Sequence, residues 1–255
     1  MHIVAFPSGA WEGDLEQFQI LRDRQVIAMG GGGFSMEPEN HLLDNYILQS
    51  SSKDYPKICF IPTASGDAKD YIDNYYNFFK NKKCVASHLS LFNGQTDKIE
   101  KFILSQDILY VGGGNTRNML TLWREWQLDK TIIKAYKRGT VLAGISAGSI
   151  CWFEQGLTDS IPGQLNKLDC LGILKGSNCP HFDGEAKRRP VFKKLIQSGQ
   201  LKDGIATDDS CALHYINEKL YRIVSSRQTA KAYSFKRQSG KTVEKILKAD
   251  FLGRQ

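Results

Sequence analysis

Short apolar runs alternate with longer segments of helical periodicity through the first 150 residues. The apolar runs are bounded by glycine, proline or charged residues, as buried strands are, and they cover residues 25–29, 57–62, 85–91, 108–111 and 141–143. Apolar side chains spaced three or four residues apart predict helices over residues 38–49, 70–80, 97–105, 117–126 and 129–138. Alternating strands and helices predict an α/β fold, with a mainly parallel, doubly wound sheet and helices on both faces.

The pattern becomes looser after residue 153. Glycine and proline indicate a loop or hairpin over residues 154–169, a short strand begins at 171–174, and a helix is predicted over 185–198. The last apolar runs predict a terminal antiparallel edge, where a homodimer could form, and they lie at residues 204–207, 212–216, 220–225 and 230–236. Residues 1–24 lack a clear strand and are interpreted as an N-terminal extension, and residues 25–255 as a single domain.

A strand-to-helix turn at residues 140–153, TVLAGISAGSICWF, is the most informative segment of the chain. Gly144 and Gly148 flank Ser146 in a G-x-S-x-G spacing. A strand that reverses sharply into a helix leaves room only for small neighbours, exposes the serine hydroxyl and directs helix N-terminal N–H groups toward it. The plain alternative is a tight turn that happens to contain serine. We predict that Ser146 is a nucleophile.

A serine nucleophile needs a base, and histidine is the usual one. Among five histidines, His181 stands in a loop-like segment, CPHFDGE, downstream of the serine. A carboxylate should orient it, and Asp159 is the first choice because it lies between Ser146 and His181 in the chain. Asp208 and Asp209 follow a strand end and are rivals, and the sequence leaves the choice between Asp159 and Asp209 open.

Two glycine-rich loops follow predicted strands and would lie at the same edge of the sheet. The loop VGGGNT can supply a backbone N–H from Gly113-Gly114 to an oxyanion hole, together with the N–H of Ala147. Asn115 ends the same glycine run and is a candidate substrate-binding residue. The glycines at 30–33 lack the G-x-G-x-x-G spacing of dinucleotide sites and predict a tight turn near the site.

Composition narrows the class of protein. The chain has 255 residues, 41% hydrophobic and 24% charged, and a net charge of +7, with basic residues scattered over predicted helices and no nucleic-acid motif. Its six cysteines form no C-x-x-C pair, which favours a reducing cytoplasm over a disulfide framework or a zinc site. No apolar run has membrane-spanning length. We expect a cytoplasmic protein with no cofactor, metal, nucleic acid or membrane partner.

The motifs VGGGNT, GISAG, T-D-x-x-P and P-H-F resemble, in this order, those of the peptidase E (aspartyl dipeptidase) family, which includes cyanophycinases. The resemblance runs from about residue 26 to residue 232. It implies a fold like that of class I glutamine amidotransferases, with Ser146 as nucleophile, His181 as base and Asp159 as orienting acid. It also implies an oxyanion hole at Gly114 and Ala147, and it places Asp209 where the family has another acid near the site.

The resemblance further implies a serine peptidase acting on small peptides, including dipeptides with an N-terminal aspartate. Arg188 or Arg189 could bind a substrate carboxylate, or could equally form a salt-bridged helix face. The segment between P-H-F and these arginines is shorter than in the dipeptidase. Asn115 and Asp209 complete the candidate substrate-binding residues. Two alternatives stay open: an esterase of the α/β-hydrolase class, and a non-catalytic binding or regulatory module.

Overall fold

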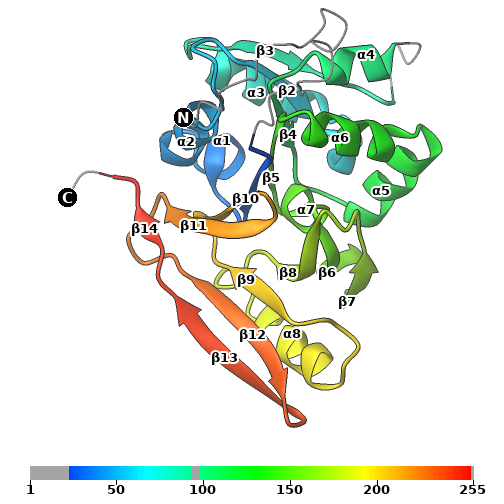
Figure 1. Cartoon of the computed structure of the whole chain (residues 1–255), viewed down its shortest axis with the longest axis vertical. Coiled ribbons are helices and arrows are strands. Elements are labelled where there is room, and N and C mark those ends of the chain that lie inside the picture. The colour runs from blue at the N-terminus through cyan, green and yellow to red at the C-terminus, as the bar shows by residue number, and fades with distance from the viewer. Residues whose placement is uncertain (1–22, 93–97, 254–255) are drawn as a thin grey trace, which may run out of the picture.

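The computed structural model describes residues 23–92 and 98–253 (Figure 1), so most of the predicted N-terminal extension and residue 97 of a predicted helix lie outside it. Its larger sheet has eight strands: β1 (Gln25–Met29), β2 (Lys57–Ile61), β3 (Val85–His88), β4 (Ile108–Val111), β5 (Val141–Ile145), β10 (Cys211–Ile216), β11 (Lys219–Ser225) and β14 (Asp250–Phe251). They lie in the order β14-β11-β10-β1-β5-β4-β2-β3. The run from β1 to β3 is parallel, as predicted, whereas β10 pairs antiparallel with both β1 and β11.

A second sheet of six strands was not predicted. It consists of β6 (Phe153–Ile161), β7 (Gln164–Asp169), β8 (Leu174–Cys179), β9 (Gly204–Thr207), β12 (Ala232–Gln238) and β13 (Lys241–Leu247). Their order is β13-β12-β9-β8-β6-β7. The β6–β7 hairpin accounts for residues 154–169, and the long β12–β13 hairpin extends away from the larger sheet (Figure 1). The expected antiparallel edge is therefore divided between two sheets.

The helices follow the predicted alternation with shifted boundaries. They are α1 (Gly33–Met36), α2 (Leu42–Gln49), the 3-10 helix η2 (Thr63–Ser65), α3 (Lys69–Phe79), α4 (Ile99–Leu104), α5 (Thr116–Glu125), α6 (Leu128–Lys137), α7 (Ala147–Ile150) and α8 (Arg188–Gln197). The helix predicted over residues 38–49 begins only at Leu42. A turn precedes it, in which the N–H of Asn40 bonds to the carbonyl of Glu37.

Both faces of the larger sheet are buried. Val26 and Ala28 of β1 belong to one apolar cluster, and Ile27 and Met29 to another, because successive strand residues point to opposite faces. Helices α4, α5 and α6 contribute to the first cluster, and α1, α2 and α3 to the second. The doubly wound arrangement predicted from the sequence is thereby confirmed. A third cluster packs α8 against the second sheet.

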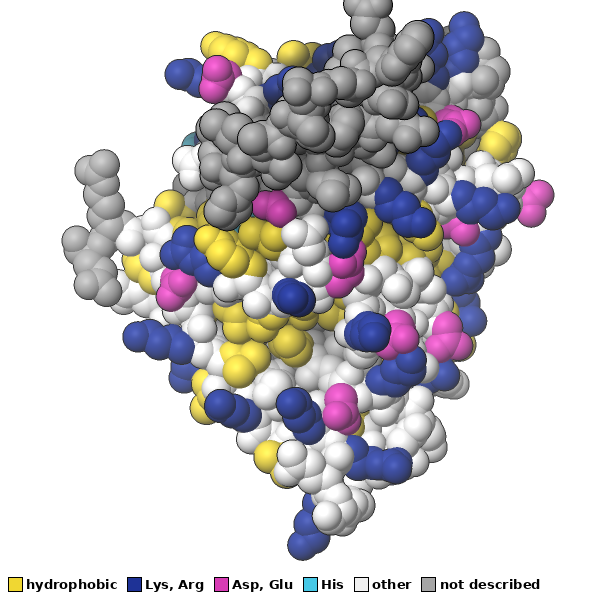
Figure 2. Space-filling model, in the orientation of Figure 1, with side chains coloured by type: hydrophobic (Ala, Val, Ile, Leu, Met, Phe, Trp, Pro, Cys, Tyr) yellow, Lys and Arg dark blue, Asp and Glu magenta, His cyan; other side chains and the backbone are white. Residues whose placement is uncertain are grey.

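The surface of the described residues carries charges of both signs. On the face shown in Figure 2, lysine and arginine side chains are interspersed with acidic ones. Across residues 23–92 and 98–253, no helix combines the length and the apolar composition that a membrane span requires.

The parallel strands β1, β5 and β4 are neighbours, so the residues that follow them meet at one edge of the sheet. Gly30 follows β1, Gly112 follows β4 and Ser146 follows β5. This edge brings together the glycine loops and the serine turn that the sequence singled out.

Candidate active site

Ser146 occupies a strained turn between β5 and α7. Its φ of 55° and ψ of −109° are unfavourable for a residue with a side chain, and such conformations persist where the surroundings enforce them. The packing around the turn does so. A Cβ on Gly144 would lie 2.4 Å from the carbonyl oxygen of Gly148, and a Cβ on Gly148 would lie 2.2 Å from that of Val111. The crowding inferred from the G-x-S-x-G spacing is present.

His181 follows β8 and is anchored to the loop that anchors Ser146. The N–H of Ser146 donates to the carbonyl of Met29 (3.1 Å), and the N–H of His181 donates to the carbonyl of Gly30 (3.2 Å). Met29 and Gly30 are consecutive, so the two acceptor carbonyls are one peptide unit apart. His181 also has a positive φ, 52°. The structure therefore brings the predicted nucleophile and the predicted base to the same end of β1.

The carboxylate that contacts the imidazole belongs to Asp209, which lies between β9 and β10. His181 Nδ1 and Asp209 Oδ1 are 2.6 Å apart, and both side chains are largely buried. The backbone N–H of Asp209 donates to Asp183 Oδ1 (2.8 Å), and Arg227 pairs with Asp183 while donating to the Asp209 carbonyl (3.2 Å). A carboxylate that accepts from Nδ1 leaves Nε2 free to take a proton from a serine.

Two glycines leave room for this carboxylate. A Cβ on Gly31 would lie 1.9 Å from Asp209 Oδ1, and a Cβ on Gly184 would lie 2.6 Å from Asp209 Oδ2. Real Cβ atoms essentially never approach so closely. Any larger residue at either position would therefore have to displace Asp209.

The expectation that Asp159 orients His181 is wrong in this structure. The Asp159 side chain is 62% exposed and lies 3.8 Å from Arg188 Nη2. β6 and β8 are parallel neighbours, with Gly156 opposite Asn178; Asp159 belongs to β6, whereas His181 follows β8. Within the described residues, the imidazole pairs with Asp209, the rival that the sequence left open.

Asp208, the other rival, has partners other than the imidazole. Its Oδ2 accepts from the backbone N–H of Lys231 (2.9 Å) and from the Tyr233 hydroxyl (3.4 Å). Burial raises the pKa of Asp208 above the usual range of a carboxyl. Asp208 therefore ties the start of β12 to the loop that carries Asp209.

The two expected oxyanion donors lie at the ends of adjacent strands. A Cβ on Gly113 would lie 3.4 Å from Ser146 Cβ, which places the VGGGNT loop against the serine. Gly114 has a φ of 134° and lies so close to Ala64 that only glycine fits. Neither the N–H of Gly114 nor that of Ala147 has an acceptor among the described residues. Both remain available to an incoming oxyanion.

Asn115 is engaged in holding the structure rather than open to a ligand. Its Oδ1 accepts from the N–H of Asn118 (2.9 Å) and so caps α5, and its Nδ2 donates to the carbonyl of Ser160 (3.0 Å). The amide thus ties the VGGGNT loop to β6. The structure assigns Asn115 a capping role, in contrast to the predicted substrate-binding role.

Arg188 is also occupied by protein groups. Its side chain is 3% exposed, lies 2.9 Å from Glu185 and 3.8 Å from Asp159, and donates to the carbonyl of Leu157 (3.3 Å). These contacts join the segment after His181 to β6. Arg188 therefore matches the second of its two predicted roles, that of a residue in a salt-bridged helix face.

Arg189 is held in a different way. Its guanidinium lies 4.5 Å from the ring centres of both Phe182 and Tyr233, and it pairs with Glu244 of β13. Stacking on two rings and a carboxylate partner fix a guanidinium firmly. Arg189 thereby connects α8 to the β12–β13 hairpin.

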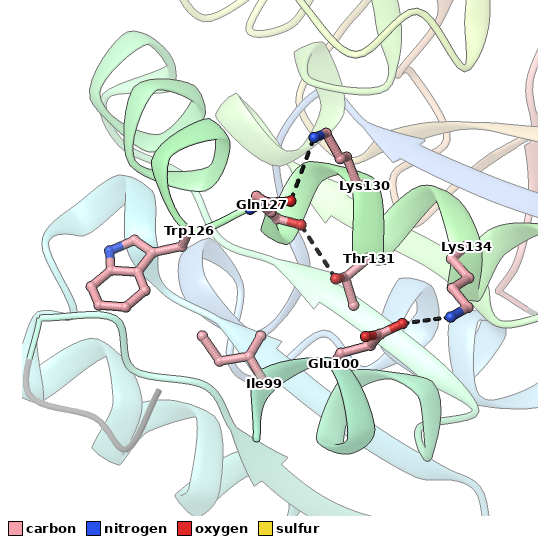
Figure 3. A pocket seen from close by; sticks show the side chains of 7 residues that line it. All are labelled: Ile99, Glu100, Trp126, Gln127, Lys130, Thr131 and Lys134. Carbon is pink, nitrogen blue, oxygen red and sulfur yellow. Dashed lines mark hydrogen bonds and ion pairs between the residues drawn. The ribbon is translucent and has the colours of Figure 1, made fainter. Parts of the chain in front are cut away.

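A separate hollow of about 400 Å³ opens between α4 and α6 (Figure 3), lined by Ile99, Glu100, Trp126, Gln127, Lys130, Thr131 and Lys134. The hollow and the VGGGNT loop lie at opposite ends of α5, because Trp126 follows the last turn of this helix and the loop precedes its first turn. A helix of ten residues is about 15 Å long. Lys134 pairs with Glu100, and Lys130 lies 3.5 Å from Gln127 Oε1. The hollow is not part of the Ser146 site.

Comparison of the sequence with known proteins gives consistent results. The model of peptidase family S51 matches residues 26–223. The chain is 53% identical to the uncharacterized peptidase YgaJ of Bacillus subtilis (strain 168) over 230 residues, which are 90% of this chain and 100% of that protein. It is 25% identical to the uncharacterized peptidase Lin0382 of Listeria innocua over 148 residues, 55% of this chain and 68% of that protein.

Two solved structures with a similar fold are described as a peptidase and a putative peptidase E. A peptidase from an acI-B1 actinobacterium superposes with a TM-score of 0.67 at 19% identity, covering 91% of this chain and 97% of that chain. A putative peptidase E from Listeria monocytogenes EGD-e superposes with a TM-score of 0.60 at 16% identity, covering 80% and 98%. At these identities the likeness is one of fold.

Proposed function

Because the chain belongs to peptidase family S51, whose members are serine-type peptidases, we propose that it hydrolyses small peptides through an acyl-enzyme formed on Ser146. One observation carries this proposal. The imidazole of His181 lies 2.6 Å from Asp209, and the backbone N–H of His181 donates to Gly30, the residue after Met29, which accepts from the backbone N–H of Ser146. Nucleophile, base and orienting acid are thus supported by one short loop at the end of β1.

The reaction follows from these positions. As Ser146 Oγ attacks the scissile carbonyl, His181 Nε2 takes the hydroxyl proton, and the negative charge of Asp209 stabilises the imidazolium that forms. The N–H groups of Gly114 and Ala147 stabilise the tetrahedral oxyanion. The imidazolium then protonates the leaving amine as the C–N bond breaks. Water, deprotonated by His181, attacks the acyl-enzyme and releases the acid product and the free serine.

The substrate proposal is a short peptide. The family resemblance suggests dipeptides with an N-terminal aspartate, whose side chain would need a cationic partner. Arg188 and Arg189 both have carboxylate partners within the protein, so neither supplies an unpaired guanidinium. Aspartyl dipeptides should therefore be assayed beside dipeptides that begin with a neutral or a basic residue.

Turnover of such a dipeptide set by purified wild type, Ser146→Ala and His181→Ala tests the proposal. We expect hydrolysis by the wild type and a loss of at least about 10³-fold in both variants, because each removes a group that acts in the chemical step. Circular dichroism should show unchanged folds. Wild-type turnover by a folded Ser146→Ala variant would rule out Ser146 as the nucleophile. Hydrolysis of short-chain esters without peptide cleavage would favour an esterase.

We also propose a cytoplasmic location. All six cysteines are unpaired in the structure, and Cys59, Cys151, Cys179 and Cys211 are buried. Burial raises the pKa of these four thiols, which keeps them protonated and unreactive. Cell fractionation followed by thiol alkylation in denaturant tests this: six alkylated thiols in the cytoplasmic fraction are expected, and disulfide-bonded protein outside it would contradict the proposal.

A further inference from the structure

Asp44 of α2 is a buried carboxyl that the proposed reaction does not use. Its side chain has no exposed surface, and neither oxygen forms a hydrogen bond of ordinary geometry within the described part of the chain, although the Tyr110 hydroxyl and the backbone N–H groups of Asp44 and Phe34 lie near enough to favour the charged form. A charged carboxylate in such a place is strongly disfavoured. The position of Asp44 therefore needs an explanation.

The carboxyl lies against the glycine loop that supports the candidate active site. A Cβ on Gly33 would lie 3.3 Å from Asp44 Oδ1 and 2.9 Å from the Tyr110 hydroxyl. Gly31, two residues earlier, lies directly against Asp209. The loop at residues 30–33 thus has Asp44 and Tyr110 on its core side and Asp209 on the side of the site.

The same loop positions the base. The carbonyl of Gly30 accepts from the backbone N–H of His181, and the carbonyl of Gly31 accepts from that of Ser210, the residue after Asp209. Gly33 is two peptide bonds from Gly31 and three from Gly30, so the loop connects the surroundings of Asp44 to these two hydrogen bonds. Within the described structure, Asp44 itself forms no hydrogen bond or ion pair with the side chain of His181 or Asp209.

Three titratable groups face Asp44 from the elements around it. They are Tyr110 of β4, Tyr71 of α3 and Lys82 in the turn after α3. Burial raises the pKa of Asp44 to about 7, opposed chiefly by the Tyr110 hydroxyl. The carboxyl is therefore neutral in mild acid and becomes charged as the pH passes neutrality.

We propose that Asp44 is a positioning residue whose neutral carboxyl supports the glycine loop in its active geometry, and whose ionisation displaces the loop and lowers turnover. This inference rests on the proposed peptidase function. An ionised Asp44 attracts the Tyr110 hydroxyl, the ammonium of Lys82 and the backbone N–H of Phe34, the residue that follows Gly33, because all three favour the charged carboxylate. These attractions move the loop from the position it has beside the neutral carboxyl, and with it His181 and Asp209.

The pH dependence of Ser146 acylation by a fluorophosphonate tests the inference in the full chain. For wild type the rate should decline above about pH 7, to about a tenth of its maximum near pH 8, because each unit above the pKa reduces the neutral fraction about tenfold. Asp44→Asn, a neutral isostere, should retain the maximal rate and lose this decline. Asp70→Asn, at an exposed carboxylate of α3, is the matched control and should keep the wild-type profile.

Tyr110→Phe provides a second variant in case Asp44→Asn does not fold. It removes the hydroxyl that lowers the pKa of Asp44, so the decline should move to higher pH. An unmoved decline in a folded variant, a folded Asp44→Asn protein that is inactive at every pH, or a wild type without a decline would overturn the role of Asp44. A wild type that reacts at no pH would instead refute the proposed function, on which this role depends.

Discussion

Gly31→Ala tests how strongly activity depends on the placement of Asp209. The added Cβ would lie 1.9 Å from Asp209 Oδ1, and real Cβ contacts essentially never fall below 3.0 Å. The carboxylate must therefore shift by at least about 1 Å, given that the backbone on both sides is held by hydrogen bonds. Gly31 does not have a left-handed φ, so alanine introduces no backbone strain there.

The expected effect is large on turnover and moderate on stability. A displacement of about 1 Å breaks a bond as short as the 2.6 Å contact between Asp209 and His181, and misplacement of this size reduces turnover by about 10²-fold or more. Overpacking a close contact destabilises a fold by about 1–3 kcal/mol. We therefore expect kcat to fall at least about 10²-fold in a protein that still unfolds cooperatively in urea.

Gly163→Ala is the control for a general loss of stability. Gly163 lies in the β6–β7 turn with a φ of 76° and no atom within 4 Å of the added Cβ, so alanine there costs about 1–2 kcal/mol of backbone strain. Its turnover should equal that of wild type. Unchanged turnover in folded Gly31→Ala protein would refute the argument. A large further loss of turnover when Gly31→Ala is added to Asp209→Asn would also refute it, because both substitutions act on the same contact between Asp209 and His181.

Three further predictions follow from the described contacts. Asp209→Asn should lower kcat by about 10²–10⁴-fold and Asp159→Asn by less than about threefold, since only Asp209 contacts His181; equal losses in steady-state assays would contradict the assignment. Arg188→Ala should lower the free energy of unfolding in urea by about 2–4 kcal/mol, because it removes a buried cation with carboxylate partners, and a change below about 0.5 kcal/mol would show that these contacts do not stabilise the fold. Burial lowers the pKa of His214 to about 4 from an ordinary value of 6.5, so the stability that the neutral imidazole contributes above pH 6.5 should be lost as the pH falls toward 4. In urea titrations, His214→Gln should make the free energy of unfolding less dependent on acid pH. The same pH dependence in the variant and the wild type would refute the burial effect.

The sequence predicted those parts of the fold and site that depend on local pattern. Strand and helix alternation determines a parallel sheet with its ligand-binding edge at the carboxyl ends of the strands. The crowding around Ser146 follows from the two glycines beside it. The glycine run in VGGGNT likewise reflects a local requirement, because Gly114 has a φ of 134° that only glycine adopts readily.

The remaining features depend on contacts between segments far apart in the chain. Asp159 was favoured because it lies between Ser146 and His181, yet it belongs to β6, whereas His181 follows the neighbouring strand β8. Asp209 reaches His181 only because Gly31, 178 residues earlier, leaves room for it. Likewise, Asp44 lies three residues before Ile47 and so on the apolar face of its helix, but its complete burial depends on elements far from it in the chain.

The second sheet was missed for a related reason. Strands β8 and β9 pair in parallel with α8 between them, whereas β6 pairs with β7 through a tight hairpin. Among the strands of this sheet, β9 and β12 overlap with predicted apolar runs, whereas β13 was not predicted. The assembly of these strands into a second sheet includes packing of α8 against β12 and β13, a contact between distant segments that short apolar runs do not reveal.

Intact-mass spectrometry after incubation with a fluorophosphonate tests the central claim most directly, because it reports whether Ser146 is an activated nucleophile without any assumption about the substrate. We predict a single adduct on wild type, none on Ser146→Ala, and a strongly slowed adduct on His181→Ala. No adduct on folded wild-type protein, or an adduct that persists in Ser146→Ala, would contradict a serine peptidase centred on Ser146.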